Sequence, residues 1–435
     1  MATIDFSNAD ENVVLNSTQV AIGSIISASS TEFVYVALDG TTQIRVTGNN
    51  LLFDANNIPT GGTVTTIAID YSGDADNDVV ISGFLSDPQI TDLITDYSST
   101  GYVNLNAQSR AVNSFFNTAF GEADTITAAD GSNGVFNQNF VGDFHTVENG
   151  DTLVSAGDLF VINQPVPNLF PVVGDGYTVH GTATGGDDLF QFADGVQPAG
   201  SLIFDVQIVD GGVVTGGDDQ LTAVNDLSIN ASIELSTFGD ADIVRDGGQL
   251  TGGSDTISDT TGTRHTFYGD ARIVEGASTL VGGNDTITTR AGSANNTIFF
   301  ADTIYGDVQT IDGGSSFTGG NDIITTGAGN DVIYGDYANL VSGVVVSGGD
   351  DRIDAGANDD MIFGNEGNDW ILGGQGGDMI DGGIGSDTAS YETSTAGVII
   401  NLDTGFATGG DADGDTLTSL TTQDPVIAFI AEDHV

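Results

Sequence analysis

Apolar and polar residues alternate in short segments that recur along most of the chain. In DTITT (285–289) and DTIS (255–258), a single isoleucine stands between threonine or serine neighbours. β-Branched residues with a period of two, bounded by Gly-rich turns, are typical of strands that bury one face. Helix formers are scarce, and the 62 glycines of the chain would destabilise helices. The pattern therefore predicts an all-β protein built from many short strands.

The alternating segments belong to a repeat of about 30 residues, which runs from about Val141 to Phe363. Each copy contains a stretch similar to YGDARIV and, further on, a turn similar to GGNDTI. A unit of this size cannot bury a face alone, but units stacked as the coils of a solenoid share a continuous core of Ile, Val, Leu and Phe. Units of different length then predict loops of different size on one side.

The charge of the chain adds a second constraint. There are 62 acidic residues and seven basic ones, all arginine, so the formal net charge is -55. Carboxylates at this density repel one another and oppose compaction unless something neutralises them. The hydrophobic content of 39% is too high for a disordered coil. A salt-adapted surface would spread its acids over helices, whereas here aspartate stands beside glycine. We therefore expect bound cations, and we exclude nucleic acid as a partner because phosphate contacts need clustered Lys and Arg.

A shorter period of nine residues follows the long repeats. The blocks GNEGNDWIL, GGQGGDMID and GGIGSDTAS fill 364–390, and each has aspartate in its sixth position. Short Asp side chains in Gly-rich turns supply hard oxygen ligands, and calcium prefers about six to eight oxygens. Asp and Gly also form good turns without a metal, but a constant spacing of nine favours a row of ions between stacked turns. The aspartates at this spacing are Asp360, Asp369, Asp378 and Asp387.

These blocks resemble the RTX (hemolysin-type) calcium-binding repeat, whose pattern is GGxGxDxUx. Residues 373–381 match this pattern, 326–334 match it apart from the first position, and 355–363 match it more loosely. The resemblance implies a right-handed parallel β-solenoid, or β-roll, with two nonapeptides per coil. In that fold the first six residues of each nonapeptide form a calcium-binding turn and the last three form a strand.

Carried over to this chain, the resemblance implies several Ca2+ ions held by turn carboxylates and turn carbonyls. In the nonapeptide region the implied ligands are Asp331, Asp360, Asp369, Asp378 and Asp387, with backbone ligands at Gly327, Gly329, Gly364, Gly367, Gly373, Gly376, Gly382 and Gly385. The longer repeats keep only diluted forms, GGxDxI and FGD or YGD. Their candidate ligands are Asp188, Asp219, Asp255, Asp285, Asp322 and Asp351 in the first form, and Asp240, Asp270, Asp307 and Asp336 in the second, where Asp143, Asp175 and Asp205 hold equivalent positions.

These patterns divide the chain into four predicted parts. They are a β-rich N-terminal cap or association module (1–120), a long-repeat solenoid (121–354), a nonapeptide β-roll (355–391) and a C-terminal segment (392–435).

The N-terminal part lacks the repeat. Strands are predicted at 33–38, 43–46 and 63–69, and a helix is predicted from Pro88 to Tyr97 because its apolar residues recur at helical spacing. The segment 61–65 resembles N-terminal modules of other secreted RTX proteins. Capping the solenoid and promoting self-association are both open as roles for this part.

The two ends of the chain bear on export. The start lacks a basic region followed by an apolar stretch, so we expect no cleavable signal peptide. No run approaches the ~18 apolar residues of a membrane helix. Proteins of the RTX family commonly leave the cell through type I secretion machinery, guided by an uncleaved C-terminal signal. The resemblance therefore predicts such a signal within 392–435 and an extracellular or cell-surface location. The absence of cysteine excludes disulfides and thiolate metal sites.

Signatures of catalysis are missing from the sequence. There is no HExxH zinc motif and no GxSxG nucleophile elbow. His265 is expected to be an exposed loop residue rather than a general base. A carboxylate-based enzyme that acts on polysaccharides stays a less favoured alternative, because 62 acids supply many pairs. We therefore expect no enzymatic activity.

Two non-enzymatic functions remain. The one we favour is a calcium-stabilised structural protein that self-associates into an extracellular filament, matrix or surface layer. The other is a calcium-dependent adhesin for cell-surface or matrix polysaccharide. An adhesin should carry an exposed aromatic or polar cluster outside the repeat, whereas the only tryptophan, Trp370, lies inside a nonapeptide and is expected to be structural.

Overall fold

A computed structural model provides the fold, and it contains two compact units, Met1–Ser201 and Leu202–Val435. In the second unit it describes residues 200–223, 235–259, 264–289, 301–420 and 426–428, counting the strand at the boundary. In the first unit the described segments are shorter. They are 3–5, 19–20, 22–37, 43–53, 59–70, 79–82, 103–104, 125–128, 140–141, 144–147, 152–155, 157, 159–162 and 172–192.

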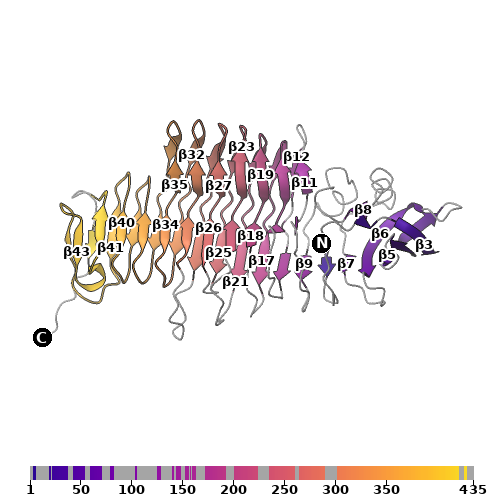
Figure 1. The fold of residues 1–435 in the computed structure, drawn as a ribbon, viewed down its shortest axis with the longest axis horizontal. Helices are drawn as coiled ribbons and strands as arrows, with labels where there is room; N and C mark the ends of the chain where they lie inside the picture. Colours follow the sequence, from indigo (N-terminus) through magenta and orange to yellow (C-terminus); the bar gives the residue numbers. More distant parts are fainter. Residues whose placement is uncertain are drawn as a thin grey trace. The chain divides into compact units, whose positions relative to one another are not determined.

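The second unit is a parallel β-solenoid in which equivalent strands of successive coils pair side by side (Figure 1). Two sheets, here called the first wall and the second wall, run through all of its coils. The first wall contains β22 (Leu235–Phe238), β26 (His265–Tyr268), β30 (Thr303–Tyr305), β34 (Val332–Tyr334), β38 (Met361–Phe363), β40 (Met379–Asp381) and β44 (Thr416–Thr418). The second wall contains β21 (Gln220–Ala223), β25 (Thr256–Asp259), β29 (Thr286–Thr289), β33 (Ile323–Thr325), β37 (Arg352–Asp354), β39 (Trp370–Leu372), β41 (Thr388–Tyr391) and β45 (Val426–Ala428).

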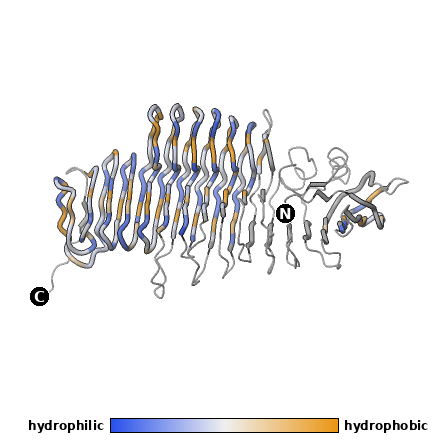
Figure 2. The backbone as a smooth tube through the Cα atoms, viewed as in Figure 1, coloured by the Kyte–Doolittle hydropathy of each residue, from blue (hydrophilic) through white to orange (hydrophobic). Residues whose placement is uncertain are grey.

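The core lies between the two walls, because wall strands turn buried residues such as Ile287 and Ile333 inward. Along the second wall the register stacks isoleucine on isoleucine, from Ile257 through Ile287 and Ile324 to Ile353 and Ile371. All five are fully buried. Hydrophobic and hydrophilic residues alternate along the coils (Figure 2). The all-β solenoid expected from the two-residue alternation is therefore confirmed.

The long-repeat coils carry two further parallel sheets, here called the arm sheets, which stand out from the walls (Figure 1). One contains β19 (Val206–Asp210), β23 (Ala241–Arg245), β27 (Ala271–Val274), β31 (Val308–Ile311) and β35 (Tyr337–Leu340). The other contains β20 (Val213–Thr215), β24 (Gln249–Thr251), β28 (Thr279–Val281), β32 (Ser316–Thr318) and β36 (Val345–Ser347). Buried residues such as Val274 and Leu280 give the arms an apolar layer of their own. Both arm sheets end where the nonapeptides begin.

Coil length shows how the two kinds of coil are related. Asp322 and Asp351 hold equivalent positions 29 residues apart, whereas Asp351 and Asp369 are 18 apart, so an arm adds 11 residues. The arm is inserted into one nonapeptide-type turn. In the nonapeptide coil 364–369 links β38 directly to β39, whereas in the preceding coil β35 and β36 interrupt the equivalent turn between Gly335 and Gly349.

Aromatic side chains stack along the first wall at the last residue of the strand, directly before the Gly-Asp or Gly-Asn of the turn. Tyr268 lies parallel to Tyr305, with ring centroids 5.0 Å apart, and Tyr305 lies parallel to Tyr334 at 5.3 Å. Phe238 and Phe363 extend the row at its two ends. Stacked aromatic pairs add about 0.5–1.5 kcal/mol each beyond the burial of their area. The aromatic position of the repeat therefore ties neighbouring coils together.

At the C-terminal side the first wall changes from parallel to antiparallel pairing. Strand β43 (Phe406–Thr408) runs antiparallel to β44, and β42 (Ile399–Asn401) runs antiparallel to β43. A short 3-10 helix, η2 (Gly410–Ala412), precedes β44 and is the only helical element among the described residues. These strands lie in the segment 392–435, in which a secretion signal is predicted, and residues 421–425 and 429–435 of that segment lie outside the described part of the chain.

The first unit combines an antiparallel sheet with parallel coils. The antiparallel strands are β3 (Ile22–Ala28), β4 (Glu32–Ala37), β5 (Gln43–Phe53), β6 (Pro59–Asp70) and β7 (Val79–Ser82), and they coincide with the predicted strands near 33–38, 43–46 and 63–69. Strand β1 (Thr3–Asp5) pairs antiparallel with β7 and parallel with β9 (Thr125–Ala128). The predicted helix at 88–97 lies outside the described residues.

Parallel pairing continues from β9 within the first unit. The strands of these coils are β10 (Phe140–Val141), β11 (Phe144–Val147), β12 (Thr152–Val154), β13 (Leu159–Ile162), β14 (Val172–Val173), β15 (Gly176–Val179), β16 (Thr182–Thr184) and β17 (Leu189–Phe192). A small antiparallel pair is formed by β2 (Gln19–Val20) and β8 (Val103–Asn104), and β18 (Gly200–Ile203) lies at the boundary of the two units.

Candidate metal centre: the carboxylate columns

The aspartates that precede the second-wall strands form one continuous column, here called column 1. The backbone N–H of each donates to the Oδ1 atom of its equivalent in the next coil, as from Asp285 to Asp322 at 2.8 Å and from Asp351 to Asp369 at 2.9 Å. All members are buried, with at most 2% of each residue exposed. Column 1 contains the predicted Asp219, Asp255, Asp285, Asp322, Asp351, Asp369 and Asp387, and the predicted Asp188 occupies the same buried position before β17 in the first unit.

The aspartates that precede the first-wall strands form a second column with the same hydrogen bonds. Asp331 donates its N–H to Oδ1 of Asp360 at 2.7 Å, and Asp360 donates to Asp378 at 3.0 Å. Column 2 therefore unites these three predicted residues. It also contains Asp302 and Asp415, which are not among the residues predicted from the sequence. A signal for Asp302 exists in the sequence, since DTIYGD at 302–307 differs in one residue from DVIYGD at 331–336.

The second carboxylate oxygen of these aspartates is buried without a hydrogen-bond donor. This holds for the Oδ2 atoms of Asp255, Asp285, Asp322, Asp351, Asp360, Asp369 and Asp378. Burying a charged oxygen without a partner costs several kcal/mol in real proteins. A fold that places an entire series of such atoms at equivalent positions therefore needs protons or cations beside them.

Backbone carbonyls meet these oxygens inside the turns. A Cβ atom added at Gly364 would collide both with Oδ2 of Asp369, in the same turn, and with the carbonyl oxygen of Gly382, in the next coil. Gly335 is flanked in the same way by Oδ2 of Asp351 and the carbonyl of Gly364. Carboxylate and carbonyl oxygens of adjacent turns thus converge on the same small space. Such an all-oxygen donor set suits calcium.

The other predicted backbone ligands also lie in these turns. Gly373 and Gly382 lie against Oδ2 of the aspartate in the sixth position of their own nonapeptide, and Gly376 and Gly385 lie against its Oδ1. The carbonyl oxygens of Gly327 and Gly367 face the glycine of the neighbouring coil, at Gly356 and Gly385. Gly329 instead donates its N–H to the carbonyl of Ala357 at 3.2 Å.

Among the described residues, no three acidic or histidine side chains converge into a ready-made metal cluster. An ion between two turns must therefore take much of its coordination from backbone carbonyls. Gly-rich turns are suited to this, because they bring carbonyls of successive coils close together.

The electrostatics of the columns agree with a requirement for a counter-charge. Burial raises the pKa of Asp369 to about 8 and that of Asp360 to about 9, and neighbouring carboxylates of the same column add to the shift. Burial likewise raises the pKa of Asp378 to about 7. In the metal-free fold these groups favour their protonated forms, whereas a bound divalent cation would favour the charged forms.

The expectation for His265 was wrong. It is not an exposed loop residue but a buried one, at the start of β26, and it occupies the column 2 position that Asp302 holds in the next coil. Its Nδ1 atom lies 3.0 Å from Oδ2 of Asp259. Burial lowers the pKa of His265, but the carboxylates of Asp259 and Asp302 outweigh this and raise it. His265 thus takes the column 2 position in the coil before Asp302, and Leu235 takes it one coil earlier. Later coils have an aspartate at this position.

The predicted aspartates of the FGD and YGD turns form a third column at the base of the arms. Column 3 contains Asp205, Asp240, Asp270, Asp307 and Asp336, all of them fully buried. Asp175 holds the equivalent buried position in the first unit, and Asp143 lies outside the described residues.

Comparisons with known proteins bear on the C-terminal half of the solenoid. A family model, the RTX calcium-binding nonapeptide repeat, matches in four copies over residues 318–339, 344–369 and 354–389. No curated protein and no solved structure matches the chain. The matched segments contain column 1 from Asp322 to Asp387 and column 2 from Asp331 to Asp378. RTX repeats of this kind bind Ca2+ at multiple sites, and the donor set of the turns fits that ion. Within residues 318–389 the chain therefore carries RTX calcium-binding repeats, which bind Ca2+.

Proposed function

We propose that this protein is a secreted structural protein that folds on binding calcium outside the cell and then self-associates into a filament, matrix or surface layer. The observation that supports it best is the series of buried, donor-less carboxylate oxygens in a chain of net charge -55 without lysine. Side chains of this sequence cannot neutralise those columns, so folding depends on an external cation.

Calcium-dependent folding suits export. Metal binding to a site that forms only in the folded state contributes its binding free energy to folding. Where calcium is scarce, carboxylate repulsion holds the chain open for passage through type I secretion machinery. Outside the cell, calcium at roughly millimolar concentration falls in the range that extracellular modules bind. RTX repeats are typical of secreted proteins. Within the described part of the chain, no helix is long and apolar enough to cross a membrane.

Self-association is supported by the end of the arm sheets. Strands β35 and β36 are the last strands of their sheets, so each leaves one edge without a strand partner among the described residues. Three apolar side chains, Leu340, Val341 and Val345, are exposed there, Val345 to 72%. An open edge with exposed apolar residues is a template for pairing with another chain.

A second apolar surface lies on the antiparallel strands at the C-terminal side. Ile399 and Phe406 are 70% and 64% exposed on the paired strands β42 and β43. Contact between two unlike surfaces of identical chains is heterologous, and it builds filaments or lattices when its rotation does not close a ring. We therefore favour a second copy of this chain as the occupant of the arm edge.

The alternative is a calcium-dependent adhesin for surface polysaccharide. Trp370 offers it little support, because the Arg352 guanidinium lies over the indole ring at 5.2 Å from the centroid and the residue is a partly buried member of the second wall. A carboxylate-based polysaccharide enzyme is the least favoured interpretation, since the buried aspartates are spread along columns rather than gathered as one acid–base pair.

Light scattering and electron microscopy of the purified chain, with and without roughly millimolar calcium, test this proposal. We expect large assemblies only with calcium, and fewer of them for Val345→Asp. Val281→Asp is the matched control, because Val281 is also exposed in the same arm sheet but lies on an inner strand. A folded monomer in calcium at high protein concentration would contradict self-association and favour the adhesin.

A further inference from the structure

The long-repeat turns contain one carboxylate more than the nonapeptide turns. From Gly239-Asp240 to Gly335-Asp336 the turn of each long coil begins with Gly-Asp, and the aspartate belongs to column 3. In the first nonapeptide turn the equivalent residue is Asn365, whose Oδ1 atom accepts from the N–H of Asp336 at 3.4 Å and from the N–H of Tyr337 at 3.3 Å. An amide therefore replaces the extra carboxylate at the point where the arms end.

One oxygen of each column 3 aspartate is held by the second half of its own turn. Oδ1 of Asp240 accepts from the N–H of Gly253 at 2.9 Å, and Oδ1 of Asp270 accepts from Gly283 at 2.8 Å. Oδ1 of Asp307 accepts from Gly320 at 2.8 Å. The Oδ2 atoms of these three aspartates are buried and receive no hydrogen bond.

Carboxylates of successive coils face each other across the glycine pair. A Cβ added at Gly252 would overlap Oδ1 of Asp270 and lie 2.8 Å from Oδ2 of Asp240. The next coil repeats the arrangement at Gly282, which lies between Oδ1 of Asp307 and, at 2.7 Å, Oδ2 of Asp270. The donor-less oxygens of column 3 thus share small spaces with the carboxylate of the following coil.

Column 1 contributes a carboxylate to the same turns. Each long-repeat turn, together with the carbonyls of the next coil that face it, is here called a layer. Gly239, the residue before Asp240, is flanked by Oδ2 of Asp255, and Gly269, the residue before Asp270, is flanked by Oδ2 of Asp285. Each layer therefore contains two buried carboxylates, one from each column. The neighbouring arginines are already engaged on the outer side of the arms, where Arg245 pairs with Asp210 and Arg272 with Asp242.

We propose that columns 1 and 3 together form a second class of calcium site, a row of buried ions at the base of the arms with two carboxylates per layer. One divalent cation per layer balances the two negative charges, and carboxylate and carbonyl oxygens supply the hard ligands that calcium prefers. Each nonapeptide turn has only one buried carboxylate, so an ion bound there meets one negative side chain fewer than an ion in a long-repeat turn. The inference rests on the proposed calcium-dependent fold and extends it to the long repeats.

The competing explanation is that the carboxylates share protons. Burial and mutual repulsion raise the pKa of Asp270 and Asp307 well above the ordinary range, and burial raises that of Asp240 to about 6. Without metal, the carboxylates of column 3 therefore tend to bind protons. The two explanations differ in what an isosteric amide does, because asparagine keeps the Oδ1 acceptor but removes one charge.

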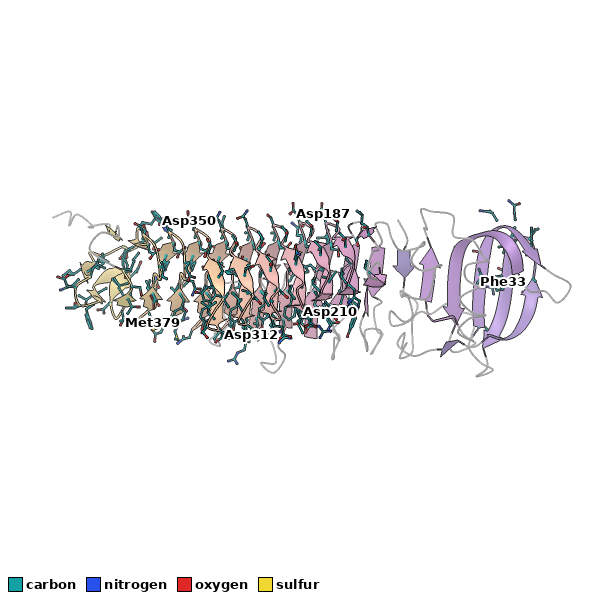
Figure 3. All side chains as sticks on the ribbon, turned by 90° about the horizontal axis from the view of Figure 1, so that it is seen from above. Phe33, Asp187, Asp210, Asp312, Asp350 and Met379 are labelled. Atoms are coloured by element: carbon teal, nitrogen blue, oxygen red, sulfur yellow. The ribbon has the colours of Figure 1, made fainter. Side chains whose placement is uncertain are left out.

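The test counts calcium ions bound to the full chain by equilibrium dialysis against calcium chloride. Asp270→Asn and Asp307→Asn should each lose about one ion and need several-fold more calcium to fold. Asn365 shows that an amide is compatible with this position of the turn. The matched control is Asp312→Asn, since Asp312 is exposed on the outside of an arm and should lose none (Figure 3).

A gain of binding provides the second arm of the test. Asn365→Asp would place a column 3 carboxylate beside Asp369 and should raise the calcium affinity of the first nonapeptide turn or add an ion. An unchanged ion count in Asp270→Asn and Asp307→Asn, together with no gain in Asn365→Asp, would overturn the proposal. If Asp369→Asn lost ions while Asp270→Asn and Asp307→Asn did not, the calcium-dependent fold would stand and the second class of site would not. A wild-type chain that bound no calcium would contradict both the proposed function and the second class of site.

Discussion

The long-repeat coils and the nonapeptide coils build the same two walls from very different lengths of chain. Successive column 1 aspartates are 29 to 37 residues apart in the long repeats and 18 apart in the nonapeptides. The register of the walls does not change at the transition, because Ile353 of the last long coil pairs directly with Ile371. The walls and columns thus form a constant frame, while the turns accept insertions.

The difference between the two regions lies in how each turn is neutralised. The nonapeptide turn is short, ends in one buried carboxylate and turns its carbonyls inward. The long-repeat turn is opened by an arm, and an additional aspartate returns across the opening to bind the second glycine of the GG pair. The two kinds of turn therefore differ by one buried carboxylate at the base of the insertion.

Removal of calcium is expected to have the largest effect on both regions. The metal-free chain should lose its β structure, since the columns would hold uncompensated charges, and it should refold at roughly 10⁻⁴ to 10⁻³ M calcium. Magnesium should replace calcium poorly, because it demands tighter octahedral geometry. Circular dichroism measures the overall change, and hydrogen exchange of the N–H groups of Asp285, in a long coil, and Asp369, in a nonapeptide coil, compares the two regions. Equal spectra with calcium and with chelator would contradict the proposed role of the ion.

Core truncation tests whether the walls are equally well packed in the two regions. Ile287→Ala in a long coil and Ile371→Ala in a nonapeptide coil should each lower the free energy of unfolding by about 2–5 kcal/mol, because both side chains are fully buried. Ile287 pairs with an isoleucine in each neighbouring coil, whereas Ile371 pairs with Ile353 and Ala389. Denaturant unfolding in saturating calcium gives the values. The control Ile323→Ala removes an exposed side chain and should cost less than about 0.5 kcal/mol. A far smaller loss at Ile371 would mean that the nonapeptide coils are the looser region.

Loss of one column carboxylate should have a smaller but measurable effect. Asp378→Ala removes the acceptor of the Asp360 N–H and one proposed calcium ligand, so it should cost about 1–3 kcal/mol and raise the calcium needed for folding. Asp413→Ala should be nearly neutral, because Asp413 is exposed and bonds only to Thr408. A calcium titration followed by circular dichroism compares the two variants. Equal shifts would show that the assigned columns are wrong.

Acid should partly replace calcium in the metal-free chain. The folded pKa values of Asp378 and Asp369, about 7 and about 8, lie above the ordinary value near 4, so the folded state binds more protons than the unfolded state. This stabilisation is complete below about pH 4 and is lost as the pH rises through about 7 to 8. Metal-free chain brought from about pH 8 to pH 5 should therefore regain some β structure. High salt at pH 8 screens surface charge and serves as the control; an equal gain there would contradict a role for column protonation.

The sequence alone was sufficient for the strands and for much of the columns. Alternation with a period of two is a local property, since successive side chains of a strand point to opposite faces, and it correctly predicted the inward isoleucines. The constant spacing of nine identified Asp360, Asp369, Asp378 and Asp387 but predicted a single row, whereas the structure places Asp360 and Asp378 in column 2 and Asp369 and Asp387 in column 1. The need for a cation likewise follows from composition, because 62 acidic residues far outnumber seven basic ones.

Only the tertiary structure decided which aspartates share a turn. Asp240 and Gly253 are 13 residues apart with an arm between them, and their hydrogen bond depends on how that arm closes rather than on any local period. The membership of Asp302 and Asp415 in column 2 and the burial of His265 depend on contacts between coils 29 to 37 residues apart. Stacking of coils sets these contacts. A one-dimensional pattern shows that the repeat exists, but not where an insertion enters it.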